Sequence, residues 1–272
     1  IAVSSNGGYI NCNYSITSNV TNASRSNGAI TYNNSVVKST SIFADYNKGN
    51  YRLGSMDGVN MGIDEPVVNG KTIILADYTD MDFTDRIKDC TVDIGAYELD
   101  NSANTTPETD DTGVATYYVT YNGRGNASAN SPMNAACWEK LQTVLNAAGQ
   151  YALENPGNNV QVKIAGYEEA EDFPYHVTAR AEENDPQSYS FVIPYGVTVL
   201  GGYNEGDSDG RGANWNTQDA TTYKTILSAV KLATSTTQAI NGYHTVTFGE
   251  KPEGWTGADK PAILDGVWLQ DG

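Results

Sequence analysis

The sequence has little charge and no long apolar run. Only 18% of its 272 residues are charged, so asparagine, serine, threonine, glycine and tyrosine have to make the surface polar. No apolar stretch reaches the length of a membrane-spanning helix, and no segment resembles a secretory signal. We therefore expect any targeting signal to lie outside this sequence or to have been removed.

Cysteine and basic charge are also scarce. The three cysteines (Cys12, Cys90 and Cys137) are far apart and lack the CxxC spacing of a zinc site. That number allows one disulfide and excludes a disulfide framework. The net charge of −17 argues against a nucleic-acid binder, because such proteins present a basic face to the phosphates.

Short apolar–polar alternation is what the first part of the chain does contain. The segments around Ile10 and Ile30 lie about 20 residues apart, and asparagines follow each of them. Strands this short, with frequent turns between them, indicate an all-β solenoid or a sandwich. A period near 20 with stacked asparagines is typical of solenoid coils that bury one another's inner face.

The second part of the chain combines one helix with several strands. Apolar residues at helical spacing predict a helix over Cys137–Tyr151, with Ser131 or Asn134 as its cap and Asn155-Pro156 at its end. Strands are predicted at 117–121, 160–164, 189–193, 197–200, 225–227, 245–248 and 262–269.

A polar stretch over 99–115 separates these two parts. It contains almost nothing that could be buried, so its composition predicts a linker. We therefore expect one domain over 1–98 and another over 116–272.

The second domain resembles the N-terminal cap and first coils of bacterial right-handed parallel β-helix surface proteins. An ordered series of short motifs carries the resemblance: Tyr117-Tyr118-Val119-Thr120, Trp138, Leu141-Gln142, Val162–Gly166, Phe191–Pro194, Gly196–Tyr203, Thr225–Ser228 and Ile263–Val267. The resemblance implies that the helix plugs an open solenoid end, and that Gly201-Gly202 and Leu264-Asp265-Gly266 form coil corners.

The first domain resembles the opposite end of the same architecture. Asp93–Glu98 is similar to the closing motif of these proteins, and Tyr51-Arg52-Leu53 and Asp85-Arg86 precede it as they do in the family. The implied fold is all-β, a right-handed parallel β-helix in two segments with one short capping α-helix. A closing motif before an opening motif predicts either a junction between tandem domains or an excerpt of a longer chain.

Four aspartates are the candidate metal ligands. Asp77, Asp80, Asp82 and Asp85 offer hard oxygen ligands of the kind that Ca²⁺ takes. The spacing lacks the glycine turn and terminal glutamate of an EF-hand loop, so a solvated acidic loop is the favoured interpretation. No cofactor other than this calcium ion is expected.

Three aromatic residues are the candidate ligand-binding residues. Tyr203, Trp215 and Trp255 fall in or beside polar loops, where flat rings could stack on sugar faces. Aromatic packing beneath a loop has the same sequence signature, and this alternative stays open.

The sequence favours a non-catalytic, structural or adhesive module at a bacterial cell surface or in a secreted protein. Its expected partners are a polysaccharide or another surface protein, with no nucleic acid and no membrane span. The tandem order, the low-charge acidic surface and the missing catalytic sets support this hypothesis. The alternative is part of a polysaccharide lyase or glycoside hydrolase whose catalytic coils lie outside this sequence.

Overall fold

A computed structural model shows two compact units, residues 1–100 and 101–272. Each unit has its own buried cluster of apolar side chains. The residues that the structure describes are 10–13, 16–18, 30–33, 36–38, 43–53, 59, 62–68, 70–83, 85–87, 91–98, 106–125, 127–206, 212–233 and 238–272.

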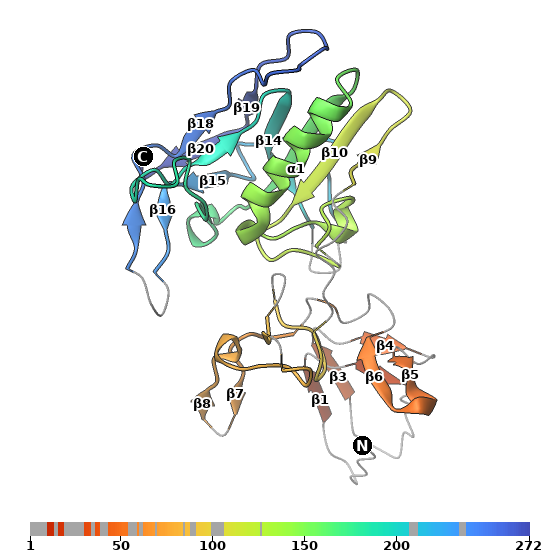
Figure 1. Cartoon of the computed structure of the whole chain (residues 1–272). Helices are drawn as coiled ribbons and strands as arrows, with labels where there is room; N and C mark the ends of the chain where they lie inside the picture. Colours follow the sequence, from red (N-terminus) through yellow and green to blue (C-terminus); the bar gives the residue numbers. More distant parts are fainter. Residues whose placement is uncertain are drawn as a thin grey trace. The chain divides into compact units, whose positions relative to one another are not determined.

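Unit 1 is built from short strands in separate pairs (Figure 1). Ile10 pairs with Ile30 in a parallel ladder, as the spacing between these segments suggests. The parallel pairs are β1 (Ile10–Asn13) with β3 (Ile30–Asn33) and β2 (Ile16–Ser18) with β4 (Val36–Lys38). The antiparallel pairs are β5 (Phe43–Asp45) with β6 (Asn50–Leu53) and β7 (Val67–Val68) with β8 (Lys71–Thr72).

A buried ion pair fixes the last described segment of unit 1. The Arg86 guanidinium pairs with Glu98 through Nη1 and donates to the carbonyl of Gly95 through Nη2. The side chains of Arg86 and Glu98 are only 14% and 2% exposed. Glu98 also accepts the backbone N–H of Asp93 at 3.1–3.2 Å, and its own N–H donates to Asp80 at 3.1 Å. Residues from Asp85-Arg86 and Asp93–Glu98, quoted above as separate motifs, thus form one hydrogen-bonded group.

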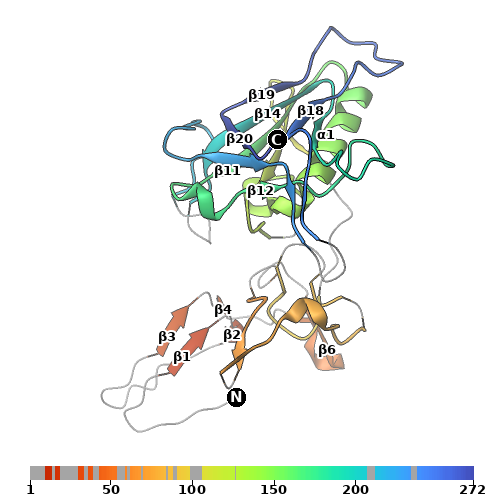
Figure 2. The ribbon, with the colours of Figure 1, turned by 90° about the vertical axis from the view of Figure 1, so that its left-hand side faces the viewer.

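Unit 2 is organised around a five-stranded sheet with the order β19-β14-β11-β10-β9 (Figures 1 and 2). The pairings of β10, β11, β14 and β19 are parallel, and β9 is antiparallel to β10. The strands are β9 (Glu108–Thr109), β10 (Val114–Val119), β11 (Asn159–Gly166), β14 (Val197–Asn204) and β19 (Ile263–Asp265). Because β9 and β10 begin within the polar stretch 99–115, the end of that stretch belongs to the sheet.

The remaining strands of unit 2 form three smaller sheets. Two of them are parallel and one is an antiparallel pair. They comprise β12 (Tyr175–His176), β15 (Thr225–Ser228) and β20 (Val267–Gln270); β13 (Phe191–Ile193) with β18 (Val246–Phe248); and β16 (Val230–Lys231) with β17 (Ile240–Asn241).

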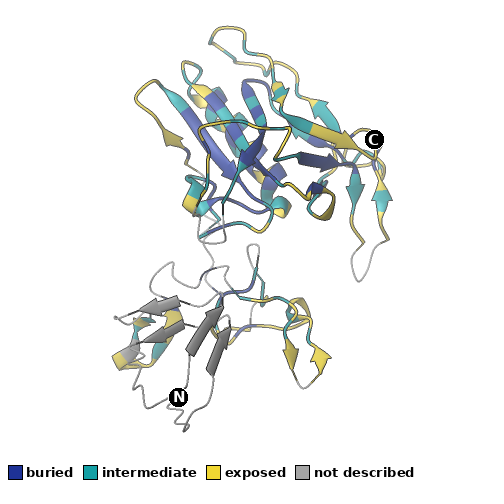
Figure 3. Cartoon of the chain, turned by 180° about the vertical axis from the view of Figure 1, so that it is seen from behind, coloured by how far each residue is buried: buried dark blue, intermediate teal, exposed yellow. Residues whose placement is uncertain are grey.

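The helix α1 (Leu141–Glu154) supplies one wall of the unit 2 core. Its inner face, including Leu141, Val144 and Leu145, packs with inward residues of β10, β11 and β14 such as Ile164. Buried residues accordingly concentrate on these strands and on α1 (Figure 3). The predicted helix is confirmed and ends before Asn155 as expected, although a 3-10 turn over Trp138–Lys140 replaces its predicted first turn.

The expected all-β parallel β-helix is wrong. The described residues form several small separate sheets, some parallel and some mixed or antiparallel, together with an α-helix. The pairings Val114–Asn159, Val160–Val197 and Thr198–Ile263 span unequal lengths of chain, so no constant repeat underlies them. Antiparallel hairpins such as β16–β17 also interrupt the parallel order. Short segments of alternating apolar and polar residues predict the strands correctly, but they do not determine which strands pair or how many belong to one sheet.

The two predicted corners differ in the structure. Gly266 has a φ of +68° and separates β19 from β20, as a corner should. Gly201 and Gly202 lie inside β14 instead, where the pairing with β11 shifts register between Lys163 and Ala165. This glycine pair therefore marks a bulge within a strand, because a residue with positive φ can kink a strand without ending it.

Candidate binding site

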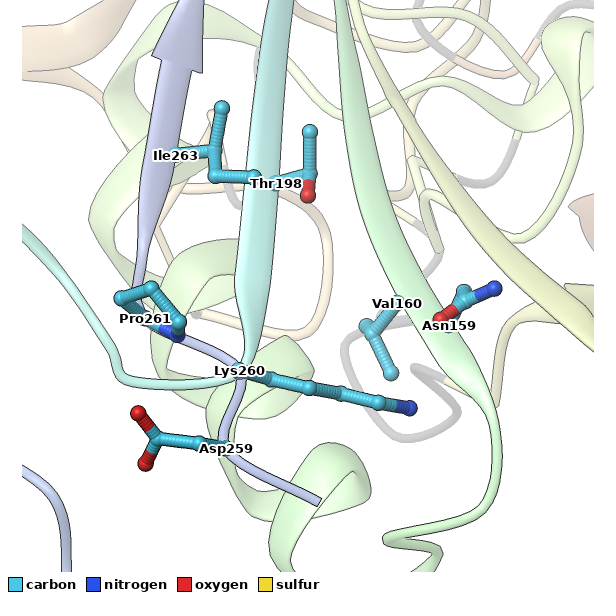
Figure 4. Close-up of a pocket in the computed structure, with 8 residues that line it drawn as sticks. Asn159, Val160, Thr198, Asp259, Lys260, Pro261 and Ile263 are labelled. Carbon is cyan, nitrogen blue, oxygen red and sulfur yellow. The ribbon is translucent and has the colours of Figure 1, made fainter.

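A hollow of about 260 Å³ opens where three parallel strands of unit 2 begin (Figure 4). It lies between the starts of β11 and β14 and the loop that leads into β19. Its lining combines polar and apolar groups: Asn159, Val160, Gly196, Thr198, Asp259, Lys260, Pro261 and Ile263. Since the starts of adjacent parallel strands meet at one sheet edge, residues far apart in the sequence converge here.

Backbone hydrogen bonds hold the rim of this hollow. The N–H of Gly196 donates to the carbonyl of Lys260 at 2.8 Å, and the N–H of Lys260 donates to the Tyr195 hydroxyl at 3.0 Å. Gly196 has a φ of +86°, and a Cβ there would lie 2.7 Å from the Trp255 ring. Only glycine fits this turn, because any side chain would meet both the strained conformation and the indole.

The Lys260 side chain is held by two backbone carbonyls beside the hollow. Its side chain extends from the loop toward Asn159 and Val160 (Figure 4). The Nζ donates to the carbonyls of Pro156 at 3.2 Å and Asn158 at 2.8 Å. The ammonium is thus held in one place at the side of the hollow formed by the loop between α1 and β11.

An aromatic pair stands next to the hollow. The rings of Tyr195 and Trp255 meet edge to face with centroids 5.1 Å apart, and Trp255 Nε1 donates to the carbonyl of Ala258 at 2.9 Å. Trp255 is partly exposed, whereas Tyr195 is 9% exposed. The indole is therefore fixed in orientation while part of its surface faces solvent.

The Asp259 carboxylate already has a hydrogen-bond donor and a cationic partner. It accepts a hydrogen bond from the Tyr195 hydroxyl and pairs with Lys251 Nζ at 3.2 Å. The Tyr195 hydroxyl and Lys251 hold the pKa of Asp259 below its usual range, while burial raises the pKa of Tyr195. The side chains of Asp259 and Lys260 extend in opposite directions (Figure 4). The aspartate therefore supports the rim, and its charge is already balanced by Lys251.

The other two predicted aromatic residues lie elsewhere. Tyr203 and Trp215 are only 5% and 7% exposed, and their rings stack on each other with centroids 5.8 Å apart. Lys163 Nζ lies 4.9 Å from the centre of the Tyr203 ring and donates to the Trp215 carbonyl at 2.7 Å. These two rings are packed in one buried cluster with Tyr118, Ala135 and Ala165, which agrees with the packing alternative that the sequence left open. Of the three predicted aromatic residues, Trp255 is the one beside the hollow.

The four aspartates of the calcium hypothesis serve separate contacts. Asp80 is 5% exposed and accepts the N–H of Asp82 at 2.8 Å as well as that of Glu98. Asp82 pairs with Arg52, and Asp77 and Asp85 are exposed. Within the described ranges, no three acidic, histidine or cysteine side chains converge as a metal ligand set. The calcium site stays a prediction of the sequence.

A second polar cluster is buried where β10, β11 and β14 end. Arg124 Nη2 lies 3.5 Å from Glu205 Oε2, with the two side chains 9% and 16% exposed. Burial raises the pKa of Glu205, and the nearby Arg124 charge opposes that shift. The Tyr167 hydroxyl contacts Glu205 and accepts the N–H of Tyr121 at 2.8 Å. These contacts join the segments that follow three strands, so we assign the cluster a structural role.

Sequence patterns missed most residues that line the hollow. Asn159, Thr198 and Lys260 carry no motif, and they come together only through the parallel pairing of β11, β14 and β19. One available signal was the run Asp259-Lys260-Pro261 directly before a predicted strand, where a lysine sits at a sheet edge.

The sequence matches no protein-family model, and neither the curated proteins nor the solved structures include a match. In the part of the chain that the structure describes, no helix is both long and apolar enough to cross a bilayer.

Proposed function

We propose that this chain is a non-catalytic extracellular module that binds a saccharide in the hollow beside Trp255. The observation that carries the proposal is a hollow lined by both polar and apolar groups, with a hydrogen-bonded, partly exposed indole packed against Gly196 of that lining. Saccharide units present hydroxyl groups around their edge and C–H groups on their faces. Asn159, Thr198 and Lys260 offer hydrogen bonds to the hydroxyl groups, and Ile263, which is 50% exposed, offers an apolar contact to the C–H groups.

The size of the hollow limits the ligand. Its volume of about 260 Å³ falls below the ~300–1,000 Å³ of pockets that enclose drug-sized molecules. We infer that it takes one sugar unit at a time. The rest of a longer glycan would lie across the rim, where Trp255 is partly exposed.

The chemistry of Cys137 supports an extracellular location. This residue is 1% exposed and disulfide-bonded. Disulfides persist in oxidising compartments and are rare in the cytosol. A secreted or surface-displayed module with one sugar site would serve adhesion to a polysaccharide.

Replacing Trp255 by alanine tests this function. We expect the Trp255→Ala variant to bind immobilised polysaccharides about tenfold more weakly than the parent chain, a loss of about 1.4 kcal/mol, because it loses the partly exposed indole that packs against Gly196 of the lining. Biolayer interferometry against a panel of neutral and charged polysaccharides measures the affinity. Thermal melting checks that the variant folds.

Trp268→Ala is the matched control, because Trp268 is 54% exposed and lies on β20. This variant should bind like the parent chain. Equal losses in the two variants, or no polysaccharide binding by the parent chain, would contradict the proposed function. Release of reducing ends from the bound polysaccharide would contradict its non-catalytic part and favour a carbohydrate-active enzyme.

A further inference from the structure

The hollow is lined by one ammonium group, that of Lys260, and by one carboxylate, that of Asp259, which pairs with Lys251. Acidic residues outnumber basic ones 33 to 16 in the whole chain, so a lysine at a binding site stands out from the acidic composition of the chain. Among the described ion pairs of unit 2, Asp259 is matched to Lys251, and none involves Lys260. The charge of Lys260 is therefore available to a ligand.

The Lys260 ammonium is also positioned in advance. A lysine has three N–H donors, and two of those on Lys260 are satisfied by the carbonyls of Pro156 and Asn158. One donor remains for a ligand. Because these two hydrogen bonds already restrict the long side chain of Lys260, a ligand would bind it at a lower cost in rotamer entropy.

We propose that the hollow selects a saccharide unit carrying an anionic substituent, whose oxygen accepts the remaining N–H of Lys260. This inference rests on the proposed function and adds its ligand class. Thr198 and Asn159 lie on the neighbouring strands and would hydrogen-bond the hydroxyls of the same unit. Charge-assisted hydrogen bonds are about twice as strong as neutral ones, so the anionic group should dominate recognition.

A carboxylate and a sulfate ester present the same chemistry to Lys260, so both are used as probes. Calorimetry with the full chain would compare a uronic-acid oligosaccharide, a sulfated oligosaccharide and a neutral oligosaccharide of equal length. We expect at least one anionic probe to bind about tenfold more tightly than the neutral one. Raising the salt concentration should reduce this preference, because salt screens the charge of an open site.

Two lysine variants make the test specific. Lys260→Gln should abolish the preference for the anionic probe, whereas Lys224→Gln, which removes the same charge outside the hollow, should keep it. Lys260→Arg retains a cation and should keep most of the preference for the anionic probe. If Lys260→Gln fails to fold, loss of that preference in a folded Lys260→Arg variant would contradict the inference.

Three other outcomes would count against the inference. Equal binding of neutral and anionic probes, unchanged in Lys260→Gln, would overturn the anionic ligand class and leave the proposed function standing. An anionic preference that Lys224→Gln weakens as much as Lys260→Gln would show a general charge effect, and this would also overturn the inference. No binding of any probe, including polysaccharides, would overturn the proposed function as well.

Discussion

Arg86→Ala is expected to destabilise unit 1 by about 3–5 kcal/mol. The substitution leaves the carboxylate of Glu98, whose side chain is 2% exposed, without its cationic partner. It also removes the donor to the carbonyl of Gly95. Removing one member of a buried ion pair is costly because the remaining charge stays away from water.

Hydrogen exchange over residues 91–98 would measure this effect locally. All four tryptophans lie in unit 2, so tryptophan fluorescence of the same variant should be unchanged.

Lys48→Ala provides the control for Arg86→Ala. Lys48 pairs with Asp45, but these side chains are 83% and 36% exposed. Exposed pairs contribute about 0–1 kcal/mol because water screens both charges. Equal exchange rates in the two variants would contradict the structural role assigned to the Arg86–Glu98 pair.

Leu145→Ala is expected to destabilise unit 2 by about 2–5 kcal/mol. Leu145 is 1% exposed on the face of α1 that packs with Ile164 and other inward residues of the sheet. The substitution loses buried apolar surface and leaves a cavity that the surrounding strands fill only in part. Urea unfolding followed by tryptophan fluorescence measures the change, since Trp138 packs against the same core.

Thr143→Ala is the control on the same helix, because Thr143 is exposed. Its effect should stay within about 0.5 kcal/mol. A similar midpoint for the two variants would mean that α1 does not pack on the sheet as described.

Local sequence patterns predicted the elements of unit 2 well. The helix shows a clear apolar period through Leu141, Val144, Leu145 and Ala148, and these four residues are buried. Most predicted strands appear within a few residues of their expected bounds. Such patterns succeed because burial of one face is decided by neighbours along the same element.

The stacking of those elements could not be predicted in the same way. Parallel pairing joins Thr198 to Ile263 across a stretch of chain that contains the strands β15 to β18, and no local signal sets that register. The family resemblance supplied a β-helix instead, which the separate sheets contradict.

The binding site was predictable only in part. Tyr203, Trp215 and Trp255 share the same sequence setting, an aromatic ring near polar loops. Packing distinguishes them, because Tyr203 and Trp215 are buried in one cluster with Tyr118, whereas Trp255 is partly exposed and packs against Gly196 of the hollow's lining. The sequence did not predict Lys260 as a site residue, because its two hydrogen-bond acceptors are backbone carbonyls, which carry no residue-type signal.

The most direct test of the central claim is to map the saccharide by amide chemical-shift perturbation. An anionic oligosaccharide added to the isotope-labelled full chain should shift the amides of Val160, Gly196, Thr198 and Lys260 first, with saturation at the calorimetric affinity. The indole N–H of Trp255 should shift with them. Perturbations confined to other surfaces, such as the Arg124–Glu205 cluster or the exposed strand β20, would contradict the assignment of the hollow as the binding site.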